Sequence, residues 1–338
     1  MIDLRSDTVT RPTDEMRKVM ASASVGDDVF REDPTVRELE GKAAAMLGKE
    51  DALFAPSATQ SNLIALLTHC QRGDEFIVGQ EAHNYLYESG GAAALGGIQP
   101  QPLWQKSDGT LDLNEVQQVI KPDDFHFART RLLSLENTTW GKVLPEGYGD
   151  LARTLADAHD LKMHLDGARL FNAVVASGER VDLIAAPFDS ISVCLSKGLG
   201  APVGSLLVGG AEFIEEGRRW RKMLGGGMRQ SGILAAAGIY ALDHHIERLE
   251  EDHEKARVLA KGLEALGGLS VDPVQTNMVF VSLPSEMKEG IDRFFSESGI
   301  RIGGYISGKL RLVTHLDVSL SDMEKVIATF RDWKAQSL

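Results

Sequence analysis

The feature that most constrains the fold is a repeated alternation of short apolar runs with segments of helical pattern over residues 33–208. Runs such as Leu132-Leu133-Ser134-Leu135 lack polar alternation, which is typical of strands covered on both faces. Asp33-Pro34 has the form of a helix N-cap followed by proline at the first helical position. Strands separated by helices require crossover connections, so the sequence predicts an α/β fold with a mainly parallel sheet.

The expected elements follow from apolar patterning and from glycine and proline punctuation. Helices are predicted at 35–47, 60–69, 84–94, 112–119 and 147–158, and strands at 51–55, 75–78, 98–103, 131–135, 162–166, 190–194 and 203–208. A long helical stretch through residue 266 should then lead to strands near 277–283 and 309–313 and a last helix at 321–334. We therefore expect a large domain over residues 1–245 and a small C-terminal α+β domain over 246–338.

Charge and cysteine content exclude several classes of protein. The formal net charge of -13 argues against nucleic acid or an anionic membrane surface as a partner. Two cysteines, Cys70 and Cys194, are too few for a disulfide framework, and no apolar run is long enough to span a membrane. A cytoplasmic location is expected. The histidines show no metal-binding constellation, so no metal is predicted.

Two polar residues follow neighbouring predicted strands. Asp166 lies in His164-Leu165-Asp166-Gly167 and Lys197 in Ser196-Lys197-Gly198-Leu199-Gly200. Ligands of open α/β sheets collect at the carboxyl ends of the strands, where these two side chains could converge. A pyridoxal 5'-phosphate (PLP) site needs this pair, because the carboxylate keeps the pyridine nitrogen protonated and the lysine binds the cofactor covalently. Taken singly, each residue could instead belong to an ordinary turn.

A phosphate site is the second requirement. Ser57-Ala58-Thr59 opens a predicted helix directly after a strand, where free backbone amides and two hydroxyls could bind an anion. An ordinary serine or threonine N-cap explains the same residues, so this motif is weak by itself.

The chain resembles the low-specificity L-threonine aldolases of PLP fold type I over essentially its whole length. The resemblance is carried by motifs in a fixed order, namely Met1-Ile2-Asp3-Leu4-Arg5-Ser6-Asp7, Gln80-Glu81-Ala82-His83, Leu135-Glu136-Asn137-Thr138, Leu165-Asp166-Gly167-Ala168-Arg169, Leu195-Ser196-Lys197-Gly198, Lys222–Gln230 and Leu310-Arg311-Leu312. It implies a large domain with a seven-stranded, mainly parallel sheet covered by helices.

The resemblance also implies roles for individual residues. Lys197 would form the Schiff base, Asp166 would pair with the pyridinium nitrogen, and His83 would stack on the ring. The phosphate would be held by Ser57, Ala58 and Thr59.

Further roles concern the substrate and a second subunit. Ser6, Arg169 and Arg311 would hold the substrate carboxylate, with Arg169 also near the phenolic oxygen of the cofactor. The family places His126 close to the substrate hydroxyl, and we expect His83 and His126 together to act as a loosely specified base. The positions of Lys222 and Arg229 suggest that they reach the cofactor site across a subunit interface, which implies a homodimer with shared sites and a homotetramer.

Three departures from the family pattern bear on substrate range. Phe30-Arg31 replaces a common Tyr-Gly, Ala58 replaces a usual glycine, and Thr139-Trp140 stands where His-Asn is common.

The implied activity is retro-aldol cleavage of L-threonine and L-allo-threonine, and of related β-hydroxy-α-amino acids, to glycine and an aldehyde such as acetaldehyde. This reaction would serve threonine catabolism and glycine biosynthesis. The alternatives are another fold type I enzyme, such as an aminotransferase or a β-lyase, and a non-catalytic protein that keeps the fold.

Overall fold

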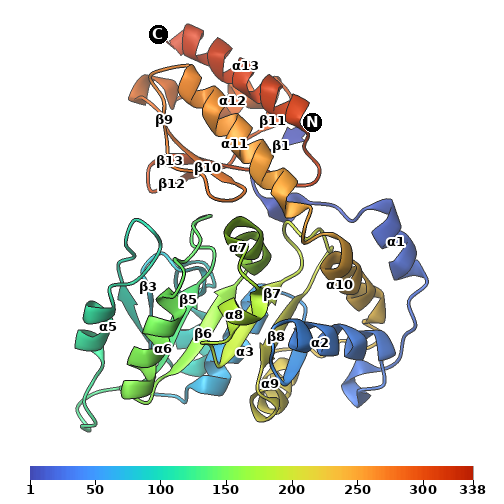
Figure 1. Ribbon diagram of the computed structural model, residues 1–338, viewed down its shortest axis with the longest axis vertical. Coiled ribbons are helices and arrows are strands. Elements are labelled where there is room, and N and C mark those ends of the chain that lie inside the picture. The colour runs from blue at the N-terminus through green and yellow to red at the C-terminus, as the bar shows by residue number, and fades with distance from the viewer. Residues whose placement is uncertain (338) are drawn as a thin grey trace.

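The computed structural model describes residues 1–337, which form a large lower part and a smaller upper part in Figure 1. The large part is built on one seven-stranded sheet. Its strands are β2 (Asp51–Ala55), β3 (Asp74–Gly79), β4 (Gln99–Leu103), β5 (Arg129–Glu136), β6 (Lys162–Gly167), β7 (Ser190–Cys194) and β8 (Ser205–Gly209).

The strand order is β2-β8-β7-β6-β5-β3-β4. Strand β8 is antiparallel to both of its neighbours, and the pairs from β7 to β4 are parallel. The predicted fold class, a mainly parallel seven-stranded sheet covered by helices, is confirmed.

Helices pack on both faces of this sheet because its strands are apolar on both faces. Leu53 packs with Ile64 and Ile214 in the layer of α3 (Ala58–His69) and α9 (Ala211–Met223), whereas Phe54 belongs with Leu39 to the larger core on the other face. The helices of the large part are α1 (Asp14–Ala21), α2 (Pro34–Met46), α3 (Ala58–His69), α4 (His83–Leu86), α5 (Leu113–Val119), α6 (Tyr148–Ala158), α7 (Leu170–Ser177), α8 (Val181–Ala185), α9 (Ala211–Met223) and α10 (Gly232–His244).

Two predicted helices are divided in the structure. The segment predicted as one helix over 84–94 consists of α4 and a π-helical turn at Ala92–Gly96, because Ser89 and Gly90 between them have φ values of 55° and 65°. The predicted long helix before residue 266 is interrupted after α10. At this break His245 and Arg248 hydrogen-bond to the Leu199 and Gly198 carbonyls, beside Lys197.

The small part has its own apolar core and includes the N-terminus. Strand β1 (Ile2–Asp3) pairs with β11, and Leu4 is buried in this core. The other elements are α11 (Leu249–Ala265), β9 (Ser270–Val271), β10 (Met278–Ser282), α12 (Ile291–Glu297), β11 (Ile300–Arg301), β12 (Tyr305–Ile306), β13 (Lys309–Val313) and α13 (Leu320–Ser337). Among residues 1–337, no helix is long and apolar enough to cross a membrane.

Candidate active site

A cavity of about 470 Å³ lies where the carboxyl ends of the parallel strands face the small part. The large part contributes His83 after β3, Glu136 at the end of β5, Arg169 after β6 and Lys197 after β7. The remaining lining residues are Ser6, Thr8, Glu81, Tyr87, Trp140, Met278, Gly304, Tyr305, Ile306 and Arg311. This location agrees with the general rule for ligand sites in open α/β sheets.

Asp166 is fixed at the carboxyl end of β6, with only 2% of its surface exposed. Its Oδ1 accepts a hydrogen bond from the Ala168 amide at 3.0 Å, and its Oδ2 accepts one from the Asn62 side chain at 2.8 Å. Lys197 follows the neighbouring strand β7 and lines the cavity. The parallel register of β6 and β7 thus brings the two predicted residues to the same edge of the sheet.

The glycines around Lys197 are explained by contacts within the chain. Gly200 and Gly204 have φ values of 78° and 111°, and a Cβ on Gly204 would lie 2.6 Å from the Phe54 ring. These glycines shape the loop that carries Lys197.

His83 hydrogen-bonds to two acidic residues, the buried Glu88 and the half-buried Glu136. Its Nδ1 lies 2.9 Å from Glu88 Oε1, and its backbone amide donates to Glu136 at 2.8 Å. The hydrogen bond with Glu88 raises the pKa of His83 above its ordinary value. Burial, with the nearby charge of Asp166, raises the pKa of Glu136 to about 7. The site therefore holds groups that can exchange protons near neutral pH.

Two arginines reach the cavity, and they differ in their pairing. The Arg169 guanidinium donates to both carboxylate oxygens of Asp7, at 2.7 and 2.6 Å. Arg311 donates to the Arg5 carbonyl at 3.0 Å, and its buried Nε has no hydrogen-bond partner among the described residues. Arg311 therefore offers the freer donor to a substrate carboxylate, while Arg169 has already been neutralised by Asp7.

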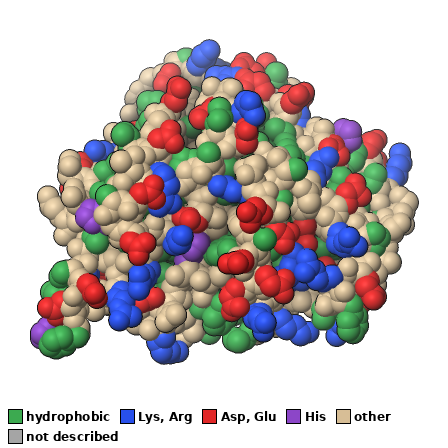
Figure 2. Space-filling model, turned by 60° about the horizontal axis from the view of Figure 1, so that its bottom comes forward, with side chains coloured by type: hydrophobic (Ala, Val, Ile, Leu, Met, Phe, Trp, Pro, Cys, Tyr) green, Lys and Arg blue, Asp and Glu red, His purple; other side chains and the backbone are tan. Residues whose placement is uncertain are grey.

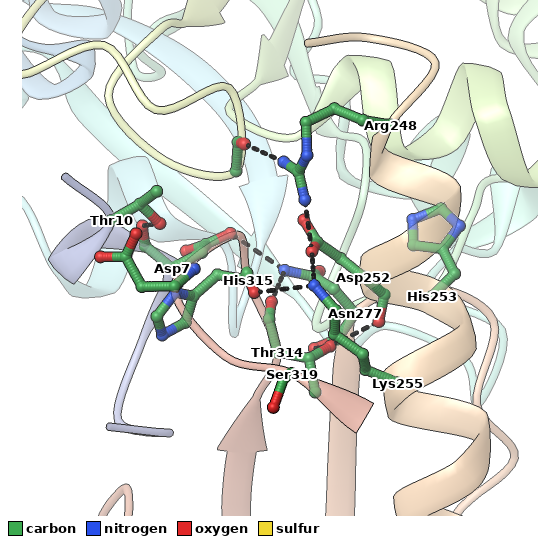
Figure 3. Close-up of polar contacts among 12 residues, drawn as sticks. Asp7, Thr10, Arg248, Asp252, His253, Lys255, Asn277, Thr314, His315 and Ser319 are labelled. Carbon is green, nitrogen blue, oxygen red and sulfur yellow. Dashed lines mark hydrogen bonds and ion pairs between the residues drawn. The ribbon is translucent and has the colours of Figure 1, made fainter. Parts of the chain in front are cut away.

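A buried network ties Asp7 to the small part (Figure 3). The Asn277 side chain donates to Asp7 at 3.2 Å and to the Thr314 carbonyl at 3.1 Å. The Thr314 hydroxyl donates to the Asp252 carbonyl, and the Asp252 carboxylate pairs with Arg248 at 2.6 Å. Arg248 in turn donates to the Gly198 carbonyl, next to Lys197. The Asp7–Arg169 pair and the lysine loop are thus held by one continuous set of contacts.

The predicted phosphate site lies at the N-terminus of α3. Ser57 is the N-cap, and its hydroxyl accepts from the Gln60 amide at 3.2 Å. Ser57 and Thr59 are exposed, and first-turn amides have no partner within a helix. Ala58 occupies this first turn in helical conformation without the need for glycine.

The site fits PLP by the chemistry of its donors and acceptors. A buried carboxylate, a cavity lysine and a helix N-terminus match the pyridine nitrogen, the aldehyde and the phosphate of the cofactor. The unpartnered Arg311 Nε adds a place for the carboxylate of an amino acid.

Three predicted site residues, His126, Lys222 and Arg229, belong neither to the cavity lining nor to the end of β6 or the N-terminus of α3. His126 lies in the segment before β5, which projects at the bottom of Figure 1, and its side chain is 67% exposed. Because β5 runs from this edge of the sheet to the other, His126 cannot flank its own chain's cavity together with His83. Lys222 and Arg229 are also exposed. They flank a loop whose Leu224 carbonyl accepts from Gln60, in the first turn of α3.

Several residues of the site had no assigned role in the sequence analysis. Glu136 ends an apolar strand, as Asp166 does, and pairs with Asp166 in register, so the same strand-end rule could have identified it. Asp7, Asn62 and Glu88 carry no comparable local signal, because they reach the site through packing between distant segments.

The fold, with the buried Asp166 at the end of β6 and the cavity-lining Lys197 after the neighbouring strand β7, defines a PLP enzyme of fold type I. Residues 3–285 match the family model described as beta-eliminating lyase. The chain is 54% identical to the low specificity L-threonine aldolase of Escherichia coli (strain K12), over 99% of this chain and 100% of that protein. The chain therefore belongs to the beta-eliminating lyase family, among the low-specificity L-threonine aldolases.

Two further comparisons agree. A probable low-specificity L-threonine aldolase of Arabidopsis thaliana is 44% identical over 97% of this chain and 96% of its own length. A solved structure of Leishmania major threonine aldolase has the same fold, with a TM-score of 0.83 and 20% identity, and each chain covers 100% of the other.

Proposed function

We propose that this chain, with PLP bound at Lys197, cleaves L-threonine and L-allo-threonine to glycine and acetaldehyde. The observation that carries the proposal is that Lys197 and Arg311 line one cavity and Asp166 lies at the neighbouring strand end, in a chain of the threonine aldolase family. When bound, the cofactor acts as an electron sink for the carbon–carbon bond that breaks.

The protein residues bind and orient both molecules in this proposal. Asp166 would hold the pyridine nitrogen, the N-terminus of α3 with Ser57, Ala58 and Thr59 would bind the phosphate, and His83 would contact the ring. Arg311 and Ser6 bind the substrate carboxylate. Arg169, which its pairing with Asp7 holds in place, lies beside them in the cavity lining. By fixing the carboxylate, these residues would orient the amino acid so that its Cα–Cβ bond breaks, and not the Cα–H bond that breaks in the reactions of an aminotransferase or a β-lyase.

A base must remove the proton of the substrate hydroxyl. His83 lines the cavity, and its hydrogen bond to Glu88 orients the ring and raises its pKa. A neutral His83, or a water that it holds, takes the hydroxyl proton as the bond to Cβ breaks.

We propose that the functional unit is a homodimer with shared sites, assembled further into a homotetramer. Lys222, Arg229 and His126 are exposed and do not line the cavity of their own chain, so a role in catalysis would require them to reach the site of a neighbouring subunit. Large apolar side chains lie exposed near them, including Phe125, which is 93% exposed, and Met223, which is 72% exposed. Such side chains favour burial in subunit contacts. On the face in Figure 2, by contrast, acidic and basic side chains are interspersed.

Among the departures from the family pattern, Trp140 is the one that bears on substrate choice. It lines the cavity and makes edge-to-face contacts with Tyr87 and Phe280, at centroid distances of 5.9 and 6.2 Å. We propose that this aromatic wall contacts the substrate side chain. Phe30 and Arg31 do not line the cavity, and Arg31 pairs with Glu215.

We further propose a domain boundary between α10 and α11, close to residue 245, with residues 1–4 packed on the small domain. A cytoplasmic location is proposed as well, in agreement with two buried cysteines that are not joined to each other.

Product analysis tests this function directly. Holoenzyme incubated with L-threonine or L-allo-threonine should release glycine and acetaldehyde in equal amounts, and the Lys197→Ala variant should release neither. Formation of a keto acid with transfer of the amino group would instead identify an aminotransferase. Ammonia release would identify a β-lyase.

A further inference from the structure

A row of polar side chains is buried beneath α3, between the helix and strands β6 and β7. Asn62 and His69 lie two helical turns apart on one face of α3. His164 and Asp166 alternate onto one face of β6, and Ser190 pairs with His164 in register on β7. Asn62, His164 and Ser190 have no exposed surface. Burying so many polar groups is costly unless each one is paired, and apolar residues would have filled this layer without that cost.

These side chains form one continuous chain of hydrogen bonds. The Asn62 Nδ2 donates to Asp166 at 2.8 Å and to Glu88 at 2.9 Å. The Asn62 Oδ1 lies 3.1 Å from His164 Nε2, and His164 Nδ1 lies 2.8 Å from Ser190 Oγ. Ser190 Oγ lies 2.7 Å from His69 Nε2 at the far end.

The direction of every hydrogen bond in this chain is determined by its acidic end. Because the Asn62 amide must donate to two carboxylates, its carbonyl must accept, so His164 carries its proton on Nε2. Burial lowers the pKa of His164 to about 3 and that of His69 to about 4, so both rings are neutral. The Ser190 hydroxyl must then donate to His164 Nδ1 and accept from His69 Nε2. All donors therefore point towards Asp166.

We propose that this series of hydrogen bonds positions the cofactor-binding carboxylate, with His164 acting through Asn62 to hold Asp166 in its orientation. His164 is thus a positioning residue for the proposed reaction, although it touches neither substrate nor cofactor. Aligned hydrogen bonds polarise one another, so each hydrogen bond in this series strengthens the one that Asn62 donates to Asp166. The inference rests on the proposed function only in that Asp166 pairs with the pyridine nitrogen.

A pair of serines on β7 provides a matched test. Ser190 belongs to this series of hydrogen bonds. Ser192 lies two residues further on the same face and is equally buried, but within residues 1–337 its side chain hydrogen-bonds only to Ser61, at 2.9 Å. In Ser190→Ala, His164 loses its donor, and kcat should fall about threefold. In His164→Leu, Asn62 loses its hydrogen bond to His164, and kcat should fall about tenfold, which is the change in an equilibrium constant that corresponds to one pKa unit. KM should stay near the wild-type value in both variants, because the substrate contacts lie elsewhere.

The decisive readout is the protonation of the pyridine nitrogen, measured by ¹⁵N NMR on enzyme reconstituted with ¹⁵N-labelled PLP. Ser190→Ala and His164→Leu should move the resonance towards the unprotonated form, His164→Gln should restore it in part, and Ser192→Ala should leave it unchanged. An unmoved resonance in a folded Ser190→Ala or His164→Leu protein would overturn the proposal, as would an equal shift in Ser192→Ala. This readout does not depend on which substrate is cleaved, so a failure here is distinct from a failure of the proposed function.

Discussion

The Arg169 guanidinium donates two hydrogen bonds to the Asp7 carboxylate, at 2.7 and 2.6 Å, across 162 positions of sequence. Burial alone would raise the pKa of Asp7, but the charge of Arg169 outweighs it and holds the pKa well below the usual range. The pair joins the N-terminal segment to the edge of the sheet at the active site.

Replacement of Asp7 by asparagine should destabilise the protein strongly. The substitution leaves Arg169 buried without its counter-charge, and breaking a buried pair costs about 3–5 kcal/mol. Because the folded pKa of Asp7 is lowered, its contribution is present above about pH 4 and is lost as the pH falls further. Urea unfolding should therefore show a difference in the free energy of unfolding between the wild type and Asp7→Asn, and this difference should become smaller as the pH falls below about 4. A difference in the free energy of unfolding below about 0.5 kcal/mol at neutral pH would show that the Asp7–Arg169 pair contributes little to stability.

The pH dependence of catalysis should report the contact between His83 and Glu88. If neutral His83 is the base, kcat/KM rises with pH through its pKa, which the hydrogen bond to Glu88 raises above the ordinary value of about 6.5. Glu88→Gln should therefore shift the acidic limb to lower pH. Glu81→Gln is a matched control, because Glu81 also lines the cavity but bonds to Ser307. An acidic limb that stays in place in Glu88→Gln would mean that another group titrates.

Asp166→Asn should retain the fold and lose most of the activity. An amide preserves the size of the side chain but cannot stabilise a protonated pyridine by charge. Removal of one such electrostatic partner typically costs about 10²–10³-fold in kcat. Circular dichroism should confirm the fold, and turnover of L-threonine close to that of the wild type would rule out the role of Asp166.

Subunit mixing should show whether sites are shared. Lys197→Ala and Arg229→Ala proteins, each inactive alone, should regain partial activity when their subunits exchange, because a hybrid dimer contains one site with both wild-type residues. The same recovery is expected when Lys197→Ala is mixed with an impaired His126→Phe protein. Absence of recovery after exchange has been verified by mass spectrometry would place these residues outside any shared site.

The sequence indicated the strand-end residues because their signal is local. An apolar run followed by Asp166 or Lys197 marks the carboxyl edge of a parallel sheet, and the structure has both residues there. His126 shows the limit of inference from resemblance. The family pattern suggested that it lies near the substrate, yet it precedes β5 and so lies at the opposite edge of its own sheet. This position could have been inferred from the sequence only by noting that His126 precedes its strand, whereas the site lies at the carboxyl ends of the strands.

Contacts among distant segments could not be inferred in the same way. Asn62 bridges Asp166, Glu88 and His164 from the first turns of α3, and no spacing in the sequence links these four residues. The break between α10 and α11 was missed because it depends on contacts with the Lys197 loop and not on glycine or proline.

The covalent attachment point of the cofactor is the most direct test of the account. Holoenzyme should be reduced with borohydride, digested and mapped by mass spectrometry, with Lys142 and Lys222 as internal comparisons. The visible absorption band should disappear, and the pyridoxyl label should be found on Lys197. A label on Lys142 or Lys222, with Lys197 unmodified, would contradict the assignment of Lys197 as the attachment point.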